Sequence, residues 1–201
     1  MSSSDTGPPE ATEWHIGSLG TTVRGLIWRG EKLPVLVIHG SGPDHDLDRW
    51  RSLPEHVHRA GHTVIVFDLP GHGLSDGEAS EEDARIAIGQ IMRDTDSTFG
   101  PGIAVITEES GNRLLPPDPL KAIVVLSPRD STGAQTGSPK LIFCGATDPA
   151  AHHAADAYLR ASRGWTLVSS FATSEQGASL LETAHAPKVA AQIVSFLRDY
   201  R

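Results

Sequence analysis

The sequence predicts an α/β fold in which helices cover both faces of an open, mostly parallel sheet. Short continuous apolar runs, such as 35–38 and 122–126, are typical of strands that are buried on both faces. Longer segments of helical character separate most of these runs. Strands that alternate with helices pair in parallel through right-handed crossovers, so we expect the functional loops beyond the carboxyl ends of the strands.

The expected strands differ in pattern along the chain. Residues 21–28 alternate loosely between apolar and polar side chains, which is typical of an antiparallel strand. The later strands are apolar almost throughout, which favours burial in the middle of a sheet. These later strands are expected at 34–38, 63–68, 103–106, 122–126, 141–144 and 165–169.

The expected helices have recognisable ends. Gly61 lies just past the first helix, where glycine is common. Ser80 and Asp83 have the spacing of a capping box at the start of the second helix. Pro149 lies in the first turn of the third helix, where its missing N–H costs nothing. The predicted helices span 48–60, 80–97, 149–163 and 187–200.

Composition bounds the class of protein. The 201 residues predict one domain over 13–201, after a polar tail over 1–12 that we expect to be disordered. The net charge of −8 argues against nucleic acid and anionic membrane surfaces as partners, because phosphate binding needs clustered Lys and Arg. Cys144 is the single cysteine, and neither a secretory signal nor a membrane helix is visible. We therefore expect a cytoplasmic protein.

Two loops narrow the choice of α/β family. The run 35–38 is followed by His39-Gly40-Ser41-Gly42, and the segment 66–77 reads VFDLPGHGLSDG. Together they resemble the α/β-hydrolase superfamily, whose small lidless members include esterases and dienelactone hydrolases. The resemblance implies a pocket or oxyanion loop at His39, Gly40 and Ser41, and a nucleophile, an acid and a histidine after the fifth, seventh and eighth core strands. A dinucleotide-binding loop at 40–42 would lack its third glycine.

A literal G-x-S-x-G motif occurs at 73–77, which would make Ser75 a nucleophile. A nucleophile elbow needs its serine directly between a strand and a helix. Residues 69–74 intervene after the strand expected to end near Asp68. We therefore interpret Ser75 as a structural residue of this loop.

The resemblance places the elbow at Thr107-Glu108-Glu109-Ser110-Gly111. Gly111 matches the last glycine of the family motif, so Glu109 occupies the nucleophile position. A shifted elbow that uses Ser110 would put Asn112 where that glycine belongs. Pro116 and the prolines after it limit the following helix to a turn or two, which would leave few N–H groups for an oxyanion.

The two remaining triad positions differ from each other. Asp148 matches the family acid, although it is equally suited to cap the helix that begins at Pro149. Gln176 stands where the family histidine belongs, and glutamine cannot relay a proton near neutral pH. His185 follows nine residues later and would need an unusual loop path to reach the elbow.

From these substitutions we predict a hydrolase homologue that has lost its hydrolytic activity and binds a small-molecule ligand or a protein partner. The alternatives are an active ester or lactone hydrolase that uses Ser110, or a lyase or isomerase in which Glu109 acts as acid or base. We expect no cofactor and no metal, since the acidic segment 44–48 has no recognisable ligand spacing. We also expect no cap domain, because only 128–139 separate the strands between which family lids usually enter.

Overall fold

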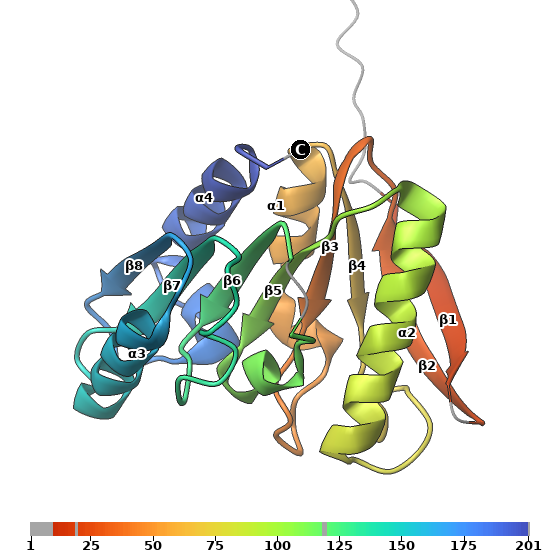
Figure 1. The fold of residues 1–201 in the computed structure, drawn as a ribbon, viewed down its shortest axis with the longest axis horizontal. Coiled ribbons are helices and arrows are strands. Elements are labelled where there is room, and N and C mark those ends of the chain that lie inside the picture. Colours follow the sequence, from red (N-terminus) through yellow and green to blue (C-terminus); the bar gives the residue numbers. More distant parts are fainter. Residues whose placement is uncertain (1–9, 19, 118–119, 201) are drawn as a thin grey trace, which may run out of the picture.

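One sheet of eight strands organises the chain (Figure 1). The computed structural model describes residues 10–18, 20–117 and 120–200. The strands lie in the order β1-β2-β4-β3-β5-β6-β7-β8. β1 and β2 run antiparallel to their neighbours, whereas the pairs from β4 to β8 are parallel. The strands are β1 (Thr12–Ser18), β2 (Thr21–Trp28), β3 (Lys32–Ile38), β4 (His62–Phe67), β5 (Ala104–Glu108), β6 (Ala122–Leu126), β7 (Lys140–Gly145) and β8 (Thr166–Phe171).

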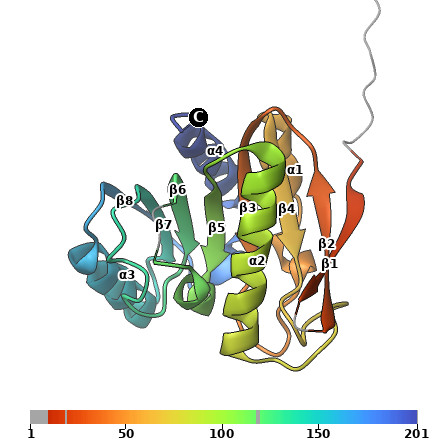
Figure 2. The ribbon, with the colours of Figure 1, turned by 45° about the vertical axis from the view of Figure 1, so that its right-hand side comes forward.

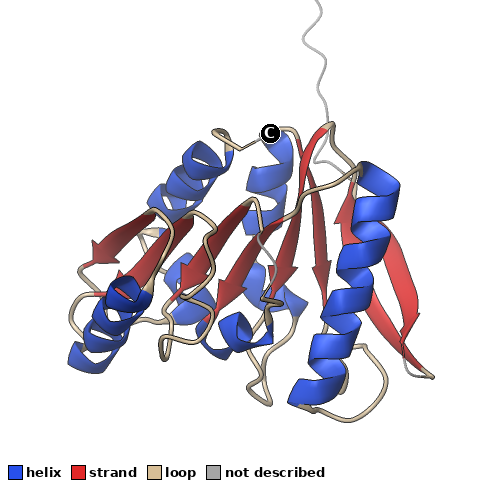
Figure 3. Ribbon diagram, in the orientation of Figure 1, coloured by secondary structure: helices blue, strands red, loops and turns tan. Residues whose placement is uncertain are grey.

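Helices cover both faces of the sheet (Figure 3). α2 and α3 lie on one face, and α1 and α4 lie on the other (Figure 2). Short 3-10 helices complete the loops at the carboxyl ends of three strands. The helices are η1 (Leu47–Trp50), α1 (Leu53–Arg59), α2 (Glu81–Phe99), η2 (Glu109–Leu114), α3 (Pro149–Ala161), η3 (Gly177–Glu182) and α4 (Ala186–Leu197).

The strand residues alternate between two hydrophobic cores. Val35 and Val37 join the core that packs against α1 and α4, whereas Leu36 and Ile38 join the core against α2 and α3. Because successive strand side chains point to opposite faces, a strand covered on both faces must be apolar throughout. The sheet confirms the predicted fold class, an α/β-hydrolase fold with a mostly parallel sheet.

Two elements differ from the prediction. β1 begins at Thr12, one residue before the expected domain start, and its only large apolar side chains are the half-buried Trp14 and Ile16. The rest of the expected tail, 1–9, lies outside the described residues. The helix expected over 48–60 is η1 followed by α1, because Pro54 lacks an N–H and is accommodated only in the first turn of α1.

The connection between β6 and β7 is short. Residues 127–139 are all described and contain neither helix nor strand, so no cap domain covers this end of the sheet. The loops after β3, β5, β7 and β8 are therefore left open at the carboxyl edge. Elsewhere in the described part of the chain, no helix has the length and apolar character that a membrane crossing requires.

Candidate functional site

The turn after β5 places Glu109 at the tip of a sharp bend. Its φ of 41° lies in the left-handed region, which costs a residue with a Cβ about 1–2 kcal/mol. β5 ends at Glu108 and η2 begins at Glu109, so the chain passes from strand to helix with no loop between. This is the geometry of a nucleophile elbow. The structure thus places Glu109 at the tip and Ser110 one residue beyond it.

Gly111 is required by close packing behind the elbow. A Cβ at this position would lie 2.2 Å from Thr107 Oγ1 and 3.0 Å from the carbonyl oxygen of His39. Thr107 is fully buried, and its hydroxyl fills the space beneath Gly111. Thr107 is therefore accommodated at the position where the resemblance implies glycine.

The carboxylate of Glu109 is held by Arg129. Arg129 donates from Nε to Glu109 Oε2 at 2.7 Å, and its Nη2 contacts the same oxygen. The Glu109 side chain is 11% exposed, whereas the Arg129 side chain is 66% exposed and reaches solvent. The pair forms part of one wall of a cleft. Oε2 of Glu109 is therefore engaged, whereas Oε1 has no hydrogen-bond partner in the described part of the chain.

Glu108, which precedes the tip, is a site residue that the sequence analysis did not identify. Its side chain is fully buried, and Oε2 accepts the N–H of Ala178 at 2.6 Å. Oε1 accepts the Nε of Arg49 at 3.2 Å and the N–H of Gly40 at 3.4 Å. A buried carboxylate is tolerated only when it is paired and hydrogen-bonded. Glu108 thus ties together the loops after β3 and β8 and η1.

His39 joins the loops after β3 and β4. Its Nδ1 donates to the Gly40 carbonyl at 2.6 Å, and its Nε2 accepts the N–H of Leu69 at 3.0 Å. Because a carbonyl only accepts and an N–H only donates, the imidazole must be neutral with its proton on Nδ1. Burial lowers the pKa of His39 to about 4, in agreement with that state. Both ring nitrogens of His39 are thus engaged by backbone groups, and its place in a pocket or oxyanion loop stays a prediction.

The N–H groups of the loop after β3 are turned inward. The N–H of Ser41 donates to Ser110 Oγ at 3.0 Å, and the two hydroxyl groups lie 3.0 Å apart. The N–H of Gly40 faces Glu108. An oxyanion hole requires free donors aimed at the reacting oxygen. Here the N–H groups of Gly40 and Ser41 already donate to the side chains of Glu108 and Ser110.

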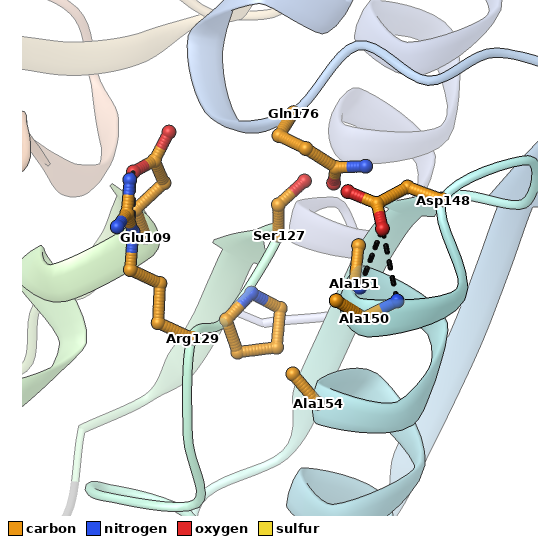
Figure 4. Close-up of a pocket in the computed structure, with 9 residues that line it drawn as sticks. Glu109, Ser127, Arg129, Asp148, Ala150, Ala151, Ala154 and Gln176 are labelled. Atoms are coloured by element: carbon orange, nitrogen blue, oxygen red, sulfur yellow. Dashed lines mark hydrogen bonds and ion pairs between the residues drawn. The ribbon is translucent and has the colours of Figure 1, made fainter.

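Asp148 and Gln176 lie together in a pocket of about 390 Å³ beside the elbow (Figure 4). Asp148 Oδ1 caps α3 by accepting the N–H groups of Ala150 at 2.9 Å and Ala151 at 3.4 Å. Gln176 Nε2 donates to the Ser174 carbonyl at 3.1 Å, which fixes the amide orientation because a carbonyl cannot donate. Gln176 Oε1 is buried without a hydrogen-bond partner among the described residues.

Ser127 is a second site residue that the sequence analysis did not identify. It follows β6, has a φ of 55° and is 3% exposed. Its hydroxyl has no hydrogen-bond partner in the described part of the chain and points into the same pocket (Figure 4). The signal available in the sequence was its place directly after a buried strand, where α/β sheets present functional side chains.

Ser75 is structural. Its hydroxyl donates to the Asp68 carbonyl at 2.7 Å and accepts the N–H of Arg24 at 2.9 Å. The Asp68 carboxylate in turn accepts the N–H groups of Leu47 and Leu74, each at 2.8 Å. The literal G-x-S-x-G motif therefore closes the loop after β4 and does not form an elbow.

His185, His45 and Asp46 lie near the rim but do not form a cluster with one another. The ring of His185 packs on Phe171, with 5.0 Å between centroids, and lines neither pocket that Glu109 lines. His45 lies against the elbow, with Nδ1 3.5 Å from Glu108 Oε1. Asp46 caps η1 by accepting the N–H of Asp48 at 3.1 Å. Among the described residues, no group of three or more His, Cys, Asp or Glu side chains is placed to hold a metal ion.

Comparisons with known proteins support the α/β-hydrolase fold. Residues 34–101 match the family described as alpha/beta hydrolase fold. An esterase from Pyrococcus furiosus is similar with a TM-score of 0.76 and 12% identity, over 95% of this chain and 91% of that one. An α/β serine hydrolase homologue from Coxiella burnetii has a TM-score of 0.76 and 14% identity, over 92% and 97%. Epoxide hydrolase A from Mycobacterium thermoresistibile has a TM-score of 0.75 and 13% identity, over 96% and 99%. No curated protein sequence is significantly similar to this chain.

Proposed function

Because the chain is an α/β-hydrolase-fold protein with a carboxylate at its elbow, we propose that it does not hydrolyse esters and instead binds a small-molecule ligand or a protein partner at this cleft. The ion pair of Glu109 with Arg129 carries the proposal. It occupies the point at which a hydrolase presents an unhindered nucleophile. The cytoplasm is the proposed location, since the single cysteine, Cys144, is buried and unpaired.

The hydrogen bonds around the elbow support the loss of hydrolysis. A tetrahedral intermediate carries a negative oxygen, and losing one donor to it costs about 100- to 1000-fold in rate. The N–H of Ser41 donates to Ser110 Oγ, and the N–H of Gly40 faces Glu108. Both donors would have to break internal bonds before they could stabilise an oxyanion.

The base position supports the same proposal. Gln176 lines the pocket beside Glu109, and its amide nitrogen is committed to the Ser174 carbonyl. An amide neither accepts nor releases a proton near neutral pH, so it cannot activate a hydroxyl group or a water molecule. Acid–base chemistry by Glu109 has less support, because Arg129 bonds its Oε2.

Short-chain p-nitrophenyl esters and a fluorophosphonate probe test the proposal. We expect no turnover above the buffer rate and no labelling of the purified protein. Ser110→Ala is the matched control, because it removes the hydroxyl next to the tip and leaves Glu109 in place. Turnover or labelling that disappears in Ser110→Ala would overturn the proposal.

One observation favours a second candidate, a hydrolase that uses Ser110. His45 and Ser110 line the same pocket of about 500 Å³, and His45 Nδ1 is 3.5 Å from the buried Glu108. This order of carboxylate, imidazole and hydroxyl would form a relocated triad. Against it, the Ser110 hydroxyl bonds Ser41. If His45→Ala and Ser110→Ala each abolish a measured esterase activity, the second candidate replaces the first.

A further inference from the structure

Oxygen atoms without a hydrogen-bond partner among the described residues line the pocket beside the elbow. The free oxygen of Asp148, the amide oxygen of Gln176 and the hydroxyl of Ser127 point toward the space between them (Figure 4). Ser127 is 3% exposed, and both its Oγ and Gln176 Oε1 are buried without a hydrogen-bond partner among the described residues. A buried acceptor that is left unpaired destabilises the protein. A ligand with hydrogen-bond donors would remove that destabilisation.

The charges that line the pocket also favour a ligand with hydrogen-bond donors. Two carboxylates, those of Glu109 and Asp148, line it together with one guanidinium, that of Arg129. Arg129 is bonded to Glu109, whereas Asp148, which caps α3, has no ion-pair partner among the described residues. A positively charged group in the pocket would bond Asp148 by a charge-assisted hydrogen bond, which is stronger than a neutral one.

The rest of the pocket wall limits the size and polarity of the ligand. Pro128 and the three alanines of the first turns of α3, Ala150, Ala151 and Ala154, form an apolar side. They face a volume of about 390 Å³, which is small for a ligand site. Such a wall suits a short aliphatic chain.

We infer that the pocket binds a short-chain aliphatic primary amine in its ammonium form. The ammonium donates its three hydrogens to Asp148, Gln176 Oε1 and Ser127 Oγ, and the chain packs on the alanines of α3. The inference rests on the proposed ligand-binding function and names the class of its ligand. No covalent step is involved.

Three probes of equal chain length separate charge from shape: n-butylammonium chloride, n-butanol and sodium butyrate. Each is titrated into ¹⁵N-labelled protein at neutral pH, and amide chemical shifts report the position and strength of binding. We expect saturable shifts for n-butylammonium at Ala150, Ala151 and Gly177, and none that saturate for butyrate. Equal shifts for n-butanol, or stronger shifts for butyrate, would overturn the inference.

Asp148→Asn is the decisive variant, because asparagine caps a helix as well as aspartate does, whereas its amide nitrogen replaces the free carboxylate oxygen, so both the charge and the acceptor for the ligand are lost. We expect the dissociation constant for n-butylammonium to rise about tenfold or more, as for loss of a charge-assisted bond. Asp156→Asn is the matched control on the same helix, since it makes the same change of charge outside the pocket. Equal binding by Asp148→Asn and the wild type would refute the inference.

The ester assay and the titration can refute the proposed function and the ligand class independently. Ester turnover lost in Ser110→Ala would refute the proposed function, whatever the titration shows. A blank ester assay with no selectivity for n-butylammonium would refute the ligand class and leave the loss of hydrolysis standing. Ala154→Phe adds a steric test, because its ring would fill the apolar side and should abolish the n-butylammonium shifts.

Discussion

The loops after β3 and β4 and the loops after β5 and β8 meet at the same rim of the sheet but differ in what their residues do. In the first pair, His39 and Asp68 each bond a backbone N–H of the other loop, and Ser75 bonds the Asp68 carbonyl within its own loop. In the second pair, Glu109 and Gln176 stand where the resemblance implies a nucleophile and a base. Asp148 agrees with the resemblance and also caps α3. The residues that match the family pattern thus all bond backbone groups, whereas Glu109, at the nucleophile position, is held by the side chain of Arg129.

The largest expected effect concerns the two glutamates of the elbow. Glu108→Ala would leave Arg49 without its partner and the N–H groups of Gly40 and Ala178 unsatisfied in the interior. We expect the free energy of unfolding to fall by about 3–5 kcal/mol. Glu109→Ala is the matched control, because Arg129 is exposed, and should cost less than about 1 kcal/mol. Urea denaturation of both variants checks this, and equal losses would contradict the comparison.

Acid should lower the free energy of unfolding, because the buried His39 ring stays neutral in the folded protein while the unfolded chain takes up a proton. The pKa of His39 is about 4 in the folded protein, against 6.5 for an unperturbed histidine, because burial disfavours the charged ring. Only the unfolded chain binds this proton between those values, so stability is full above the unfolded pKa and falls as pH decreases from about 6.5 to 4. The integrated loss is about 3 kcal/mol. His62, whose pKa burial also lowers, adds to the loss, and Asp68, whose pKa burial raises, opposes it.

Urea denaturation over this range, with His39→Gln for comparison, measures the effect. The stability difference between the wild type and His39→Gln should shrink as the pH falls, because glutamine does not titrate. Direct titration of the His39 ring by NMR provides the check, and a value near 6.5 would contradict the prediction.

The two serines of the rim should differ in their importance for stability. Ser75→Ala removes a donor to the Asp68 carbonyl and an acceptor for the N–H of Arg24, and should cost about 1–2 kcal/mol. Ser110→Ala removes one acceptor near the surface and should cost about 0.5 kcal/mol. Thermal unfolding of the two variants ranks them. A larger loss for Ser110→Ala would mean that the elbow is also structural.

The cap of α3 should contribute less to stability than Ser75 does. Asp148→Ala should cost about 1 kcal/mol, because the N–H groups of Ala150 and Ala151 lose their acceptor. Asp148→Asn should be nearly neutral, because asparagine is an equally good cap. Chemical denaturation of both variants distinguishes a cap from a residue without structural importance, for which alanine and asparagine would give the same value.

The sheet and its helices could be predicted because buried parallel strands require apolar runs. The absence of a cap domain could be predicted because only 128–139 separate the strands between which family lids enter. β1 could not, because only Trp14 and Ile16 of that strand pack on the sheet. The position of the elbow could be predicted by aligning the residues that follow the strand at 103–106 with the family motif. The positions of Glu108 and Ser127 did not, because their contacts come from segments far away in sequence, such as the 70 residues between Glu108 and Ala178.

The contacts of Glu108 have a consequence for recognition. One carboxylate fastens the loop after β3, η1 and the start of η3, so the rim around the elbow is preorganised before any ligand arrives. Binding to such a rim sacrifices little conformational entropy, and selectivity then comes from fit to a fixed shape. We expect the free and occupied forms to superimpose closely at these loops.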